Sequence, residues 1–526
     1  MLYDEHTWGG FASVEEFGEA FKKLPADKYS DLEASWADKT NYIVTANKIT
    51  NEILKTNLNA LATSVNQNGP RLVVYNPLPW TRSGRIEIPG KPGNFMLADD
   101  VPAGGYKTFP LDKIPSSDPA DISGNSIENE YFKVTLDPAR GVISSFTDKR
   151  SGKELIDATA GQGLGQYINE RFTLEQTLEY TYKYQQGRAL GSFGNPADKD
   201  WPHPGIYKPG MISEKEVPYR AASPSAGVFK ITRDDLGETA ILTMPGNDTN
   251  HMPATELHIR LDNGRDYLDM EIFIKDKSRD NWPEADWLCL PFKISDPSFR
   301  VGRNLGFMSP EEILPGANRH LYTTGSGITI TGSDGSGMAV CPLDHPLVSL
   351  GVPGCWKFSL DYIPKKPVVY LNLYNNQWNT NFRYWYSGSW SSRVRIRTFD
   401  KNADGNRALV TSSMEARMPM LVSVADGPGG DLPTEQEGIR TSRTGIAVTA
   451  FGTDFDGSEG ILLRVWEQGG VSGEVIISLP AGCEALKALP VNLRGEREGK
   501  PLRIKNSQFS FNLGAFAPAC FILSDD

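Results

Sequence analysis

The stretch His258-Ile-Arg-Leu-Asp-Asn-Gly-Arg-Asp-Tyr-Leu-Asp-Met-Glu-Ile-Phe-Ile-Lys275 carries the clearest fold signal in this sequence of 526 residues. From 268 to 274 every second residue is apolar, which is the period of a strand with one buried face. The dipeptide Asn263-Gly264 before this run is typical of a tight hairpin turn. The stretch therefore predicts two antiparallel strands.

The same pattern continues on both sides of this hairpin. Ile127 to Asp137 and Val142 to Lys149 predict another hairpin across a short loop, and alternating runs recur as far as residue 399. The sequence also contains 51 glycines and 36 prolines, which are typical of turns between short strands. We expect a mainly β protein, with a sheet system of more than two hundred residues at its centre.

The N-terminal part has a helical period instead. Ser13-Val14-Glu15-Glu16 has the form of a capping box, and a longer helix is expected from Asp31 to about Val65. Its apolar stripe consists of Trp36, Ile43, Ala46, Ile49, Ile53, Leu54, Leu58 and Leu61. Because two helices make a thin bundle, we expect this stripe to be covered by sequence before Met1 or by the β-domains.

Turn-rich segments divide the chain, which is too long for one core. Asn68-Gly69-Pro70, the Pro/Ser/Asp-rich segment 112–124 and Asp404-Gly405-Asn406 are the predicted boundaries. We expect a small helical bundle over residues 13–67, a small β-domain over 68–120, a large β-sandwich over 121–400 and a C-terminal β-sandwich over 401–526.

Charge and cysteine content exclude several classes of protein. A formal charge of −11 and a pI near 5.3 argue against nucleic acid or an anionic membrane as partner. We expect no membrane span and no secretory signal at Met1, and the localisation stays open. The five cysteines are scattered, so we expect free thiols rather than a disulfide framework.

Residues 372–390 are unusually rich in amides and aromatic rings. Amide groups donate and accept hydrogen bonds at once, and flat rings match the C–H faces of a sugar, so this composition suits a neutral polyhydroxylated ligand. The alternative is that most of the rings are ordinary strand core. The polar candidates are Asn375, Asn376, Gln377, Asn379, Thr380 and Asn381.

The first residues also contain several side chains that can bind a metal or a substrate. His6 could ligate a metal, and Asp4 or Glu5 could orient it or bind substrate hydroxyls. The alternative is a solvated histidine without a role, because one histidine does not make a metal site.

Several of these stretches together resemble glycoside hydrolase family 38, the retaining zinc-dependent α-mannosidases, in the bacterial branch. The stretches are Asn76-Pro77-Leu78-Pro79-Trp80, Glu128-Asn129-Glu130-Tyr131-Phe132, Gly141 to Lys149, and Asn375 to Phe382. Asp4-Glu5-His6-Thr7-Trp8-Gly9 resembles the segment that ends the family's catalytic barrel. Their common order along the chain supports the resemblance.

The resemblance implies a galactose-mutarotase-like supersandwich over residues 121–400 and a barrel remnant over residues 1–12. It also implies that His6 is one ligand of a zinc site whose other ligands come from the barrel. The nucleophile and the acid/base carboxyl group belong to that barrel too, so we expect no catalytic residue in this chain. The expected substrate-binding residues are Asp4, Asn376, Trp378, Asn379, Thr380 and Asn381.

Three hypotheses follow. In the first, the chain is the C-terminal half of an α-mannosidase that is inactive alone and is completed by a barrel polypeptide. In the second, it is a stand-alone carbohydrate-binding or assembly module. In the third, it is a scaffold without a sugar site. Exposure of Trp36, Ile43 and Ile53 would indicate a missing partner. Burial or internal pairing of the amide run would indicate a scaffold.

Overall fold

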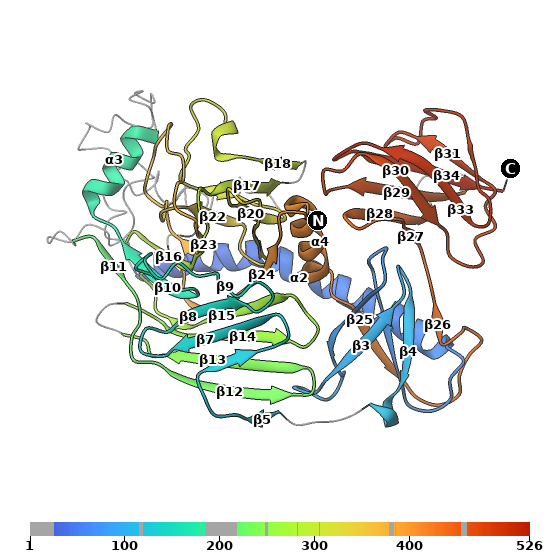
Figure 1. Ribbon diagram of the computed structural model, residues 1–526, viewed down its shortest axis with the longest axis horizontal. Helices are drawn as coiled ribbons and strands as arrows, with labels where there is room; N and C mark the ends of the chain where they lie inside the picture. The colour runs from blue at the N-terminus through green and yellow to red at the C-terminus, as the bar shows by residue number, and fades with distance from the viewer. Residues whose placement is uncertain are drawn as a thin grey trace.

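The computed structural model describes residues 26–114, 119–184, 218–247, 251–280, 282–303, 306–377, 383, 385–453 and 460–525. Within them the chain is mainly β, as predicted, and every strand ladder is antiparallel. In Figure 1 the large sandwich lies on the left, a small sheet at the lower right and a C-terminal β-domain at the upper right.

The large sandwich stacks two sheets face to face. The six-stranded sheet has the order β11 (Arg220–Ala222), β10 (Gln166–Arg171), β16 (Glu284–Pro291), β23 (Val368–Asn375), β22 (Leu347–Leu350), β19 (Tyr322–Thr323). The ten-stranded sheet has the order β18 (Gly306–Met308), β17 (Ser298–Arg303), β20 (Gly327–Thr331), β21 (Gly337–Pro342), β24 (Gly388–Phe399), β15 (Tyr267–Lys277), β14 (Ala254–Asp262), β13 (Gly237–Met244), β12 (Val228–Asp234), β5 (Ala120–Asp121).

Strand sequences explain which sheet is covered on one face and which on both. β15 alternates between buried and partly exposed residues, because one face of the ten-stranded sheet packs on the core. All eight residues of β16 are buried. Leu288 and Leu290 face the sandwich core, whereas Trp287 and Cys289 belong to a second cluster on the opposite face. The six-stranded sheet is therefore covered on both sides.

Both hairpins predicted from the sequence are confirmed. β14 pairs with β15 across the Asn263-Gly264 turn, where Gly264 takes the left-handed φ of +69° that glycine tolerates. The second hairpin belongs to a four-stranded sheet beside the sandwich, in the order β6 (Ser126–Glu128), β7 (Phe132–Asp137), β8 (Val142–Asp148), β9 (Lys153–Glu154).

The small sheet combines strands from two distant parts of the chain. Its order is β25 (Leu421–Ala425), β1 (Arg71–Tyr75), β4 (Tyr106–Pro110), β26 (Glu435–Gln436), with β2 (Arg82–Glu87) and β3 (Phe95–Val101) as a separate pair and η2 (Leu111–Lys113) after β4. The sequence analysis expected a small domain within 68–120. Two of its four strands instead come from beyond the large sandwich.

The C-terminal β-domain has two sheets around its own apolar cluster. They are β27 (Arg440–Thr441), β30 (Gly473–Ser478) and β33 (Gln508–Leu513) in one sheet, and β28 (Ile446–Thr453), β29 (Ile461–Glu467), β34 (Pro518–Ser524), β31 (Lys487–Val491) and β32 (Leu502–Arg503) in the other.

Three α-helices are described, α2 (Ala26–Ser64), α3 (Leu174–Tyr184) and α4 (Gly405–Arg417), together with the short η5 (Pro310–Glu312). The sequence analysis interpreted Asp404-Gly405-Asn406 as a turn. The Asp404 carboxylate accepts hydrogen bonds from the backbone N–H groups of Asn406 and Arg407, so this residue caps α4 instead. No described helix is long and apolar enough to cross a membrane. All five cysteines are free, as expected.

α2 is a single helix of 39 residues, about 58 Å long at 1.5 Å per residue, and it confirms the helix expected from about Asp31 to Val65. The rest of the expected bundle, over residues 13–25, lies outside the described residues. Trp36 is buried with 5% of its surface exposed, but Ile43 and Ile53 are 55% and 58% exposed. The apolar stripe is therefore covered only in part.

Arg71 holds the end of α2 on the small sheet. Its buried guanidinium donates to five backbone carbonyls at 2.9–3.4 Å, two in the last turn of α2, one at Gly69 and two at Gly427 and Pro428. One side chain thus satisfies helix-end carbonyls and joins two segments that lie more than 350 positions apart.

We expect Arg71→Met to lower the free energy of unfolding by about 3 kcal/mol or more, because hydrogen bonds of charged groups contribute about 1.5–3 kcal/mol each. Urea unfolding followed by far-UV circular dichroism measures this loss. The control is Arg494→Met, since Arg494 is exposed. Equal midpoints for the two variants would contradict the role given to Arg71.

Candidate functional site

The amide-rich segment leaves the six-stranded sheet at the end of β23. There Asn375 pairs with Ala285 at the start of β16, and Arg171 at the end of β10 pairs with Glu284. Three neighbouring strands therefore place polar side chains at one edge of the sandwich. We treat this edge as the candidate site.

Asn376 is the one predicted substrate-binding residue within the described chain. Its side chain is 1% exposed. The amide nitrogen donates to the carbonyl of Trp282 at 2.8 Å, and the amide oxygen accepts from the backbone N–H of Glu284 at 2.8 Å. These bonds fix the segment to the first residue of β16. Contact of Asn376 with a substrate stays a prediction.

The neighbouring amides also have internal partners. Asn375 Nδ2 donates to Asn372 Oδ1 at 2.7 Å, and Asn375 Oδ1 accepts from the backbone N–H of Gln377 at 3.1 Å. Gln377 is 4% exposed and its oxygen accepts from the N–H of Trp356 at 3.1 Å. The described half of the amide run therefore builds the edge of the sheet, as the scaffold hypothesis expects.

The other predicted site residues lie outside the described chain. They are Asp4, His6, Trp378, Asn379, Thr380 and Asn381. Among the described residues, no three histidine, cysteine, aspartate or glutamate side chains gather as they would around a metal ion. The zinc site implied by the resemblance therefore stays a prediction that rests on His6.

A fully buried ion pair includes Glu284, whose backbone N–H donates to Asn376. Lys277 Nζ, at the end of β15, is 2.7 Å from Glu284 Oε1 on β16, and their side chains are 1% and 0% exposed. The ammonium group also donates to the carbonyl of Ser278 at 3.2 Å and lies 4.9 Å from the ring centre of Tyr374. Burial raises the pKa of Glu284 to about 7, against the opposing effect of Lys277.

A second buried carboxyl group lies two residues along the same strand. Asp286 has no exposed surface, and its Oδ1 accepts from Asn169 Nδ2 at 2.7 Å. Arg220 on β11 donates to the oxygen of that asparagine. Burial raises the pKa of Asp286 well above its ordinary value. Asp286 and Glu284 face the same side of β16 because the strand period is two.

Glu170 on β10 is the third buried carboxyl group. It is 1% exposed and accepts from the hydroxyl of Tyr219 and the indole nitrogen of Trp287, both at 2.7 Å. Burial raises its pKa as well. Clusters of shifted carboxyl groups often mark active sites, but these three are sealed from solvent. In this conformation they can hold strands together and cannot reach a glycosidic bond.

α2 lies against this edge. The rings of Trp36 and Trp385 meet edge to face with centres 4.8 Å apart, and Trp385 Nε1 donates to Glu33 Oε1 at 3.0 Å. The Arg279 guanidinium lies 4.8 Å from the Trp385 ring centre and 3.7 Å from Glu33. The helix and the end of the amide-rich segment therefore form one surface.

The buried ionic residues were not predicted from the sequence. A signal was present in β16, where Glu284 and Asp286 stand on one face of an otherwise apolar run. Nothing in the sequence pairs Glu284 with Lys277, because Lys277 follows a break in the alternation of β15.

The described fold is a multi-sheet antiparallel β protein with a buried polar edge. An α-mannosidase from Enterococcus faecalis V583 aligns over 94% of this chain and 60% of its own, with a TM-score of 0.63 and 9% identity. A protein in glycosyl hydrolase family 38 from Enterococcus faecalis aligns over 95% of this chain and 63% of its own, with a TM-score of 0.59 and 8% identity. The predicted resemblance to family 38 is thereby confirmed at the level of the fold.

The chain spans about 60% of the length of these two solved structures. Every strand ladder in the described residues is antiparallel, so the described part of this chain contains no barrel of parallel strands. A galactose mutarotase-like protein from Lactobacillus casei also aligns, over 53% of this chain at 10% identity, but its TM-score of 0.28 is too low to support an argument. No protein-family model and no curated protein sequence matches the chain.

We expect Lys277→Met to lower the free energy of unfolding by about 3–5 kcal/mol, because it leaves Glu284 buried without its cation. Lys277→Met combined with Glu284→Leu should recover most of this loss. Thermal unfolding of the two variants checks both statements. If the double variant is no more stable than the single one, the loss does not come from an unpaired charge.

Glu284 should also make stability depend on pH. Its pKa rises from an ordinary value of 4.5 to about 7 on folding, so between these values the folded state binds a proton that the unfolded state lacks. This contribution is fully present below pH 4.5 and is lost as the pH rises to 7. We expect unfolding curves from pH 4.5 to 7.5 to show this decline for the wild type and a weaker decline for Glu284→Gln.

Proposed function

We propose that this chain is the non-barrel portion of a family 38-like α-mannosidase and completes a glycosidase site together with a catalytic barrel. The observation that carries the proposal is an apolar surface on α2, considered together with a fold that covers only about 60% of the similar enzymes. Sealed carboxyl groups at the candidate site agree with catalytic groups supplied from elsewhere.

The apolar surface consists of Tyr42, Ala46, Ile49 and Ile53 and is called the α2 stripe below. Its last three residues belong to the apolar stripe predicted from the sequence. These residues recur at steps of four and three, so they lie above one another on one helical face. Tyr42, Ile49 and Ile53 are 47%, 51% and 58% exposed. Exposed apolar side chains in a row are typical of a protein interface.

The position of the α2 stripe supports a barrel as its partner. The N-terminal part of α2 packs on Trp385 beside the amide-rich segment, and its C-terminal part packs on β25 of the small sheet. The stripe lies between these anchors, so a domain docked on it would lie next to the candidate site. The corresponding polypeptide is the portion of the E. faecalis enzymes without a counterpart here.

In this proposal His6 supplies one zinc ligand, and the barrel supplies the others with both catalytic carboxyl groups. When bound, zinc would polarise sugar hydroxyls. The contribution of this chain's described residues is structural, because Asn376, Glu284 and Lys277 fix the start of the amide-rich segment. The proposal assigns substrate contact to Trp378, Asn379, Thr380 and Asn381.

The proposal is tested by hydrolysis of an aryl α-mannoside with added zinc. The purified chain is assayed alone and after mixing with the polypeptide encoded immediately upstream. We expect activity only in the mixture. Turnover by the chain alone would overturn the proposal, since it would place the catalytic groups among its own residues. Absence of both association and activity in the mixture would equally count against it.

The α2 stripe gives a sharper test. We expect Ile49→Glu with Ile53→Glu to weaken association with the barrel polypeptide at least 100-fold, because two buried apolar side chains contribute about 1.5–3 kcal/mol each. Analytical ultracentrifugation measures the association. The matched control is Leu314→Glu, since Leu314 is apolar and 78% exposed elsewhere on the chain. An equal effect of both changes would show that the stripe is not the interface.

A further inference from the structure

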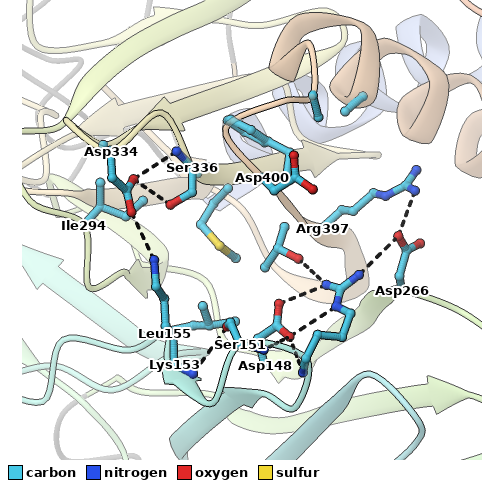
Figure 2. Close-up of a pocket in the computed structure, with 18 of the residues that line it drawn as sticks. Asp148, Ser151, Lys153, Leu155, Asp266, Ile294, Asp334, Ser336, Arg397 and Asp400 are labelled. Carbon is cyan, nitrogen blue, oxygen red and sulfur yellow. Dashed lines mark hydrogen bonds and ion pairs between the residues drawn. The ribbon is translucent and has the colours of Figure 1, made fainter.

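A groove of about 1220 Å³ lies at the other end of the sandwich from the candidate site. Its walls are the β8–β9 turn, the β20–β21 turn and the first turns of α4 (Figure 2). Thr444, between β27 and β28, also lines it. β16 connects the two places, with Glu284 at one end and Pro291 at the other, about 23 Å away at 3.3 Å per residue, and Lys293 of the groove follows two residues later.

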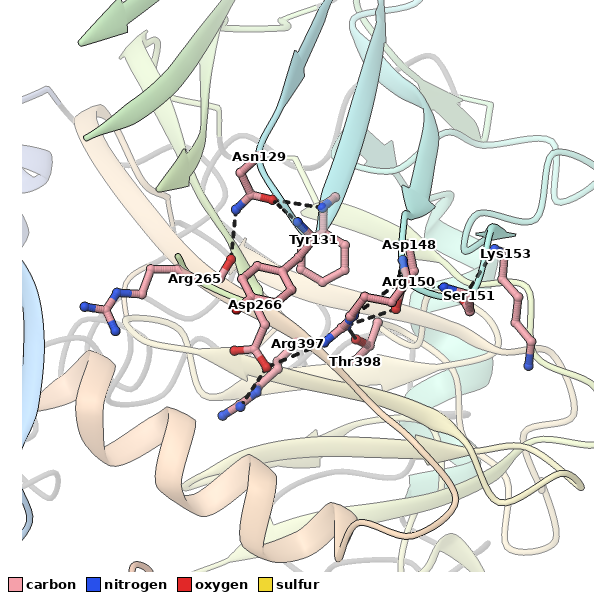
Figure 3. A network of polar contacts seen from close by, with 11 residues as sticks. Asn129, Tyr131, Asp148, Arg150, Ser151, Lys153, Arg265, Asp266, Arg397 and Thr398 are labelled. Carbon is pink, nitrogen blue, oxygen red and sulfur yellow. Dashed lines mark hydrogen bonds and ion pairs between the residues drawn. The ribbon is translucent and has the colours of Figure 1, made fainter. Parts of the chain in front are cut away.

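The charges on the groove are paired with one another. Arg150 Nη2 is 2.9 Å from Asp148 Oδ2, and Arg150 Nη1 is 3.9 Å from Asp266 Oδ2, which also accepts from Arg397 at 2.8 Å. Arg150 also donates to the Thr398 hydroxyl at 2.8 Å. Figure 3 shows these side chains converging from three strands or turns onto one patch. The patch holds two cations and two anions in fixed positions.

A second pair crosses the groove. Lys153 Nζ on β9 is 3.0 Å from Asp334 Oδ2 in the β20–β21 turn, and Ser336 donates to the same carboxylate at 2.6 Å (Figure 2). Hydrogen bonds from Ser336 and Lys153 hold the pKa of Asp334 below its ordinary value. Leu155 and Ile294 lie beside this pair and add partly exposed apolar surface.

This lining selects a class of ligand. Five basic and six acidic side chains line the groove, so their charges nearly cancel, and an anion or a cation would meet a like charge beside each partner. Seven serine and threonine residues also line it. Fixed donors, fixed acceptors, hydroxyls and small apolar surfaces match a neutral polyol. The volume exceeds the range of about 300–1,000 Å³ typical of small-molecule pockets, so the ligand is longer than one sugar.

We propose that the groove between the β8–β9 turn, the β20–β21 turn and α4 binds a neutral oligosaccharide of several sugar units. This site is separate from the edge where the barrel is proposed to dock, and its occupation needs neither zinc nor a catalytic group. It would hold a long glycan on the protein while one of its ends is processed elsewhere.

The test is direct binding by the purified chain alone, measured by titration calorimetry with an α-linked mannotetraose, maltotetraose and inorganic phosphate as separate probes. The variant is Lys153→Ala with Asp334→Ala. These side chains are 60% and 57% exposed, and such exposed pairs add little to stability, so the variant should fold. The matched control is Lys230→Ala with Asp121→Ala, an equally exposed pair at 2.9 Å on the far edge of the ten-stranded sheet.

We expect at least one tetraose to bind, and the groove variant to bind it about tenfold or more weakly, because two hydrogen-bonding partners are lost. The control variant should bind like the wild type. Phosphate binding that displaces the tetraose, an unchanged affinity of the groove variant, or no binding of either tetraose would each overturn the proposal. None of these outcomes depends on whether the chain completes an α-mannosidase, since no barrel is present in the experiment.

Discussion

The stacking of the six-stranded sheet on the ten-stranded sheet is the constraint on which the rest of the structure depends. The six-stranded sheet is covered on both faces, so polar side chains on its central strands are removed from water. Such groups are costly unless each finds a partner. Lys277 forms an ion pair with Glu284, and Asn169 donates a hydrogen bond to Asp286. Glu170 accepts hydrogen bonds from Trp287 and Tyr219. The Lys277–Glu284 pair joins the two sheets, whereas the other two sets hold neighbouring strands of the six-stranded sheet together.

Because of this constraint, the buried carboxyl groups hold the structure in place and do not contact a ligand. The shifted carboxyl groups lie below the surface, next to the end of β23, where Asn375 and Asn376 bond within the protein. The described part of the candidate site therefore has a structural role, in which buried charged groups fix the end of β23. The groove lined by Lys153 and Asp334, at the other end of the sandwich, has exposed ionic groups. Such groups can give up a hydrogen bond to each other and form one with a ligand.

Much of the fold could be predicted from the sequence. The hairpin at 258–275 and the helix from about Asp31 follow from local periods of two and of three to four, and local periods survive whatever the chain packs against. α4 was missed because Asp404-Gly405-Asn406 favours a turn as much as a helix start, and the tertiary setting decided between them. The pairing of β1 with β25 joins residues about 350 positions apart, which no local pattern encodes.

The site was harder to predict for a related reason. The amide-rich segment was visible by composition, but composition does not tell a ligand-binding amide from one that bonds to its own backbone, as Asn376 does. The Lys277–Glu284 pair depends on the meeting of two sheets and so has no signal in either strand alone. The resemblance to family 38 was found from short stretches in a common order, and the solved structures agree with it in fold.

The small sheet implies a particular order of events during synthesis. β1 and β4 emerge from the ribosome early, but their neighbours β25 and β26 follow only after the whole large sandwich. The free edge of β1 stays open to other chains until β25 is made, and the free edge of β4 until β26 is made. The sandwich is in effect an insertion between halves of the small sheet, so rapid folding of the insertion would bring the late strands to the early ones and shorten the time for which those edges can aggregate.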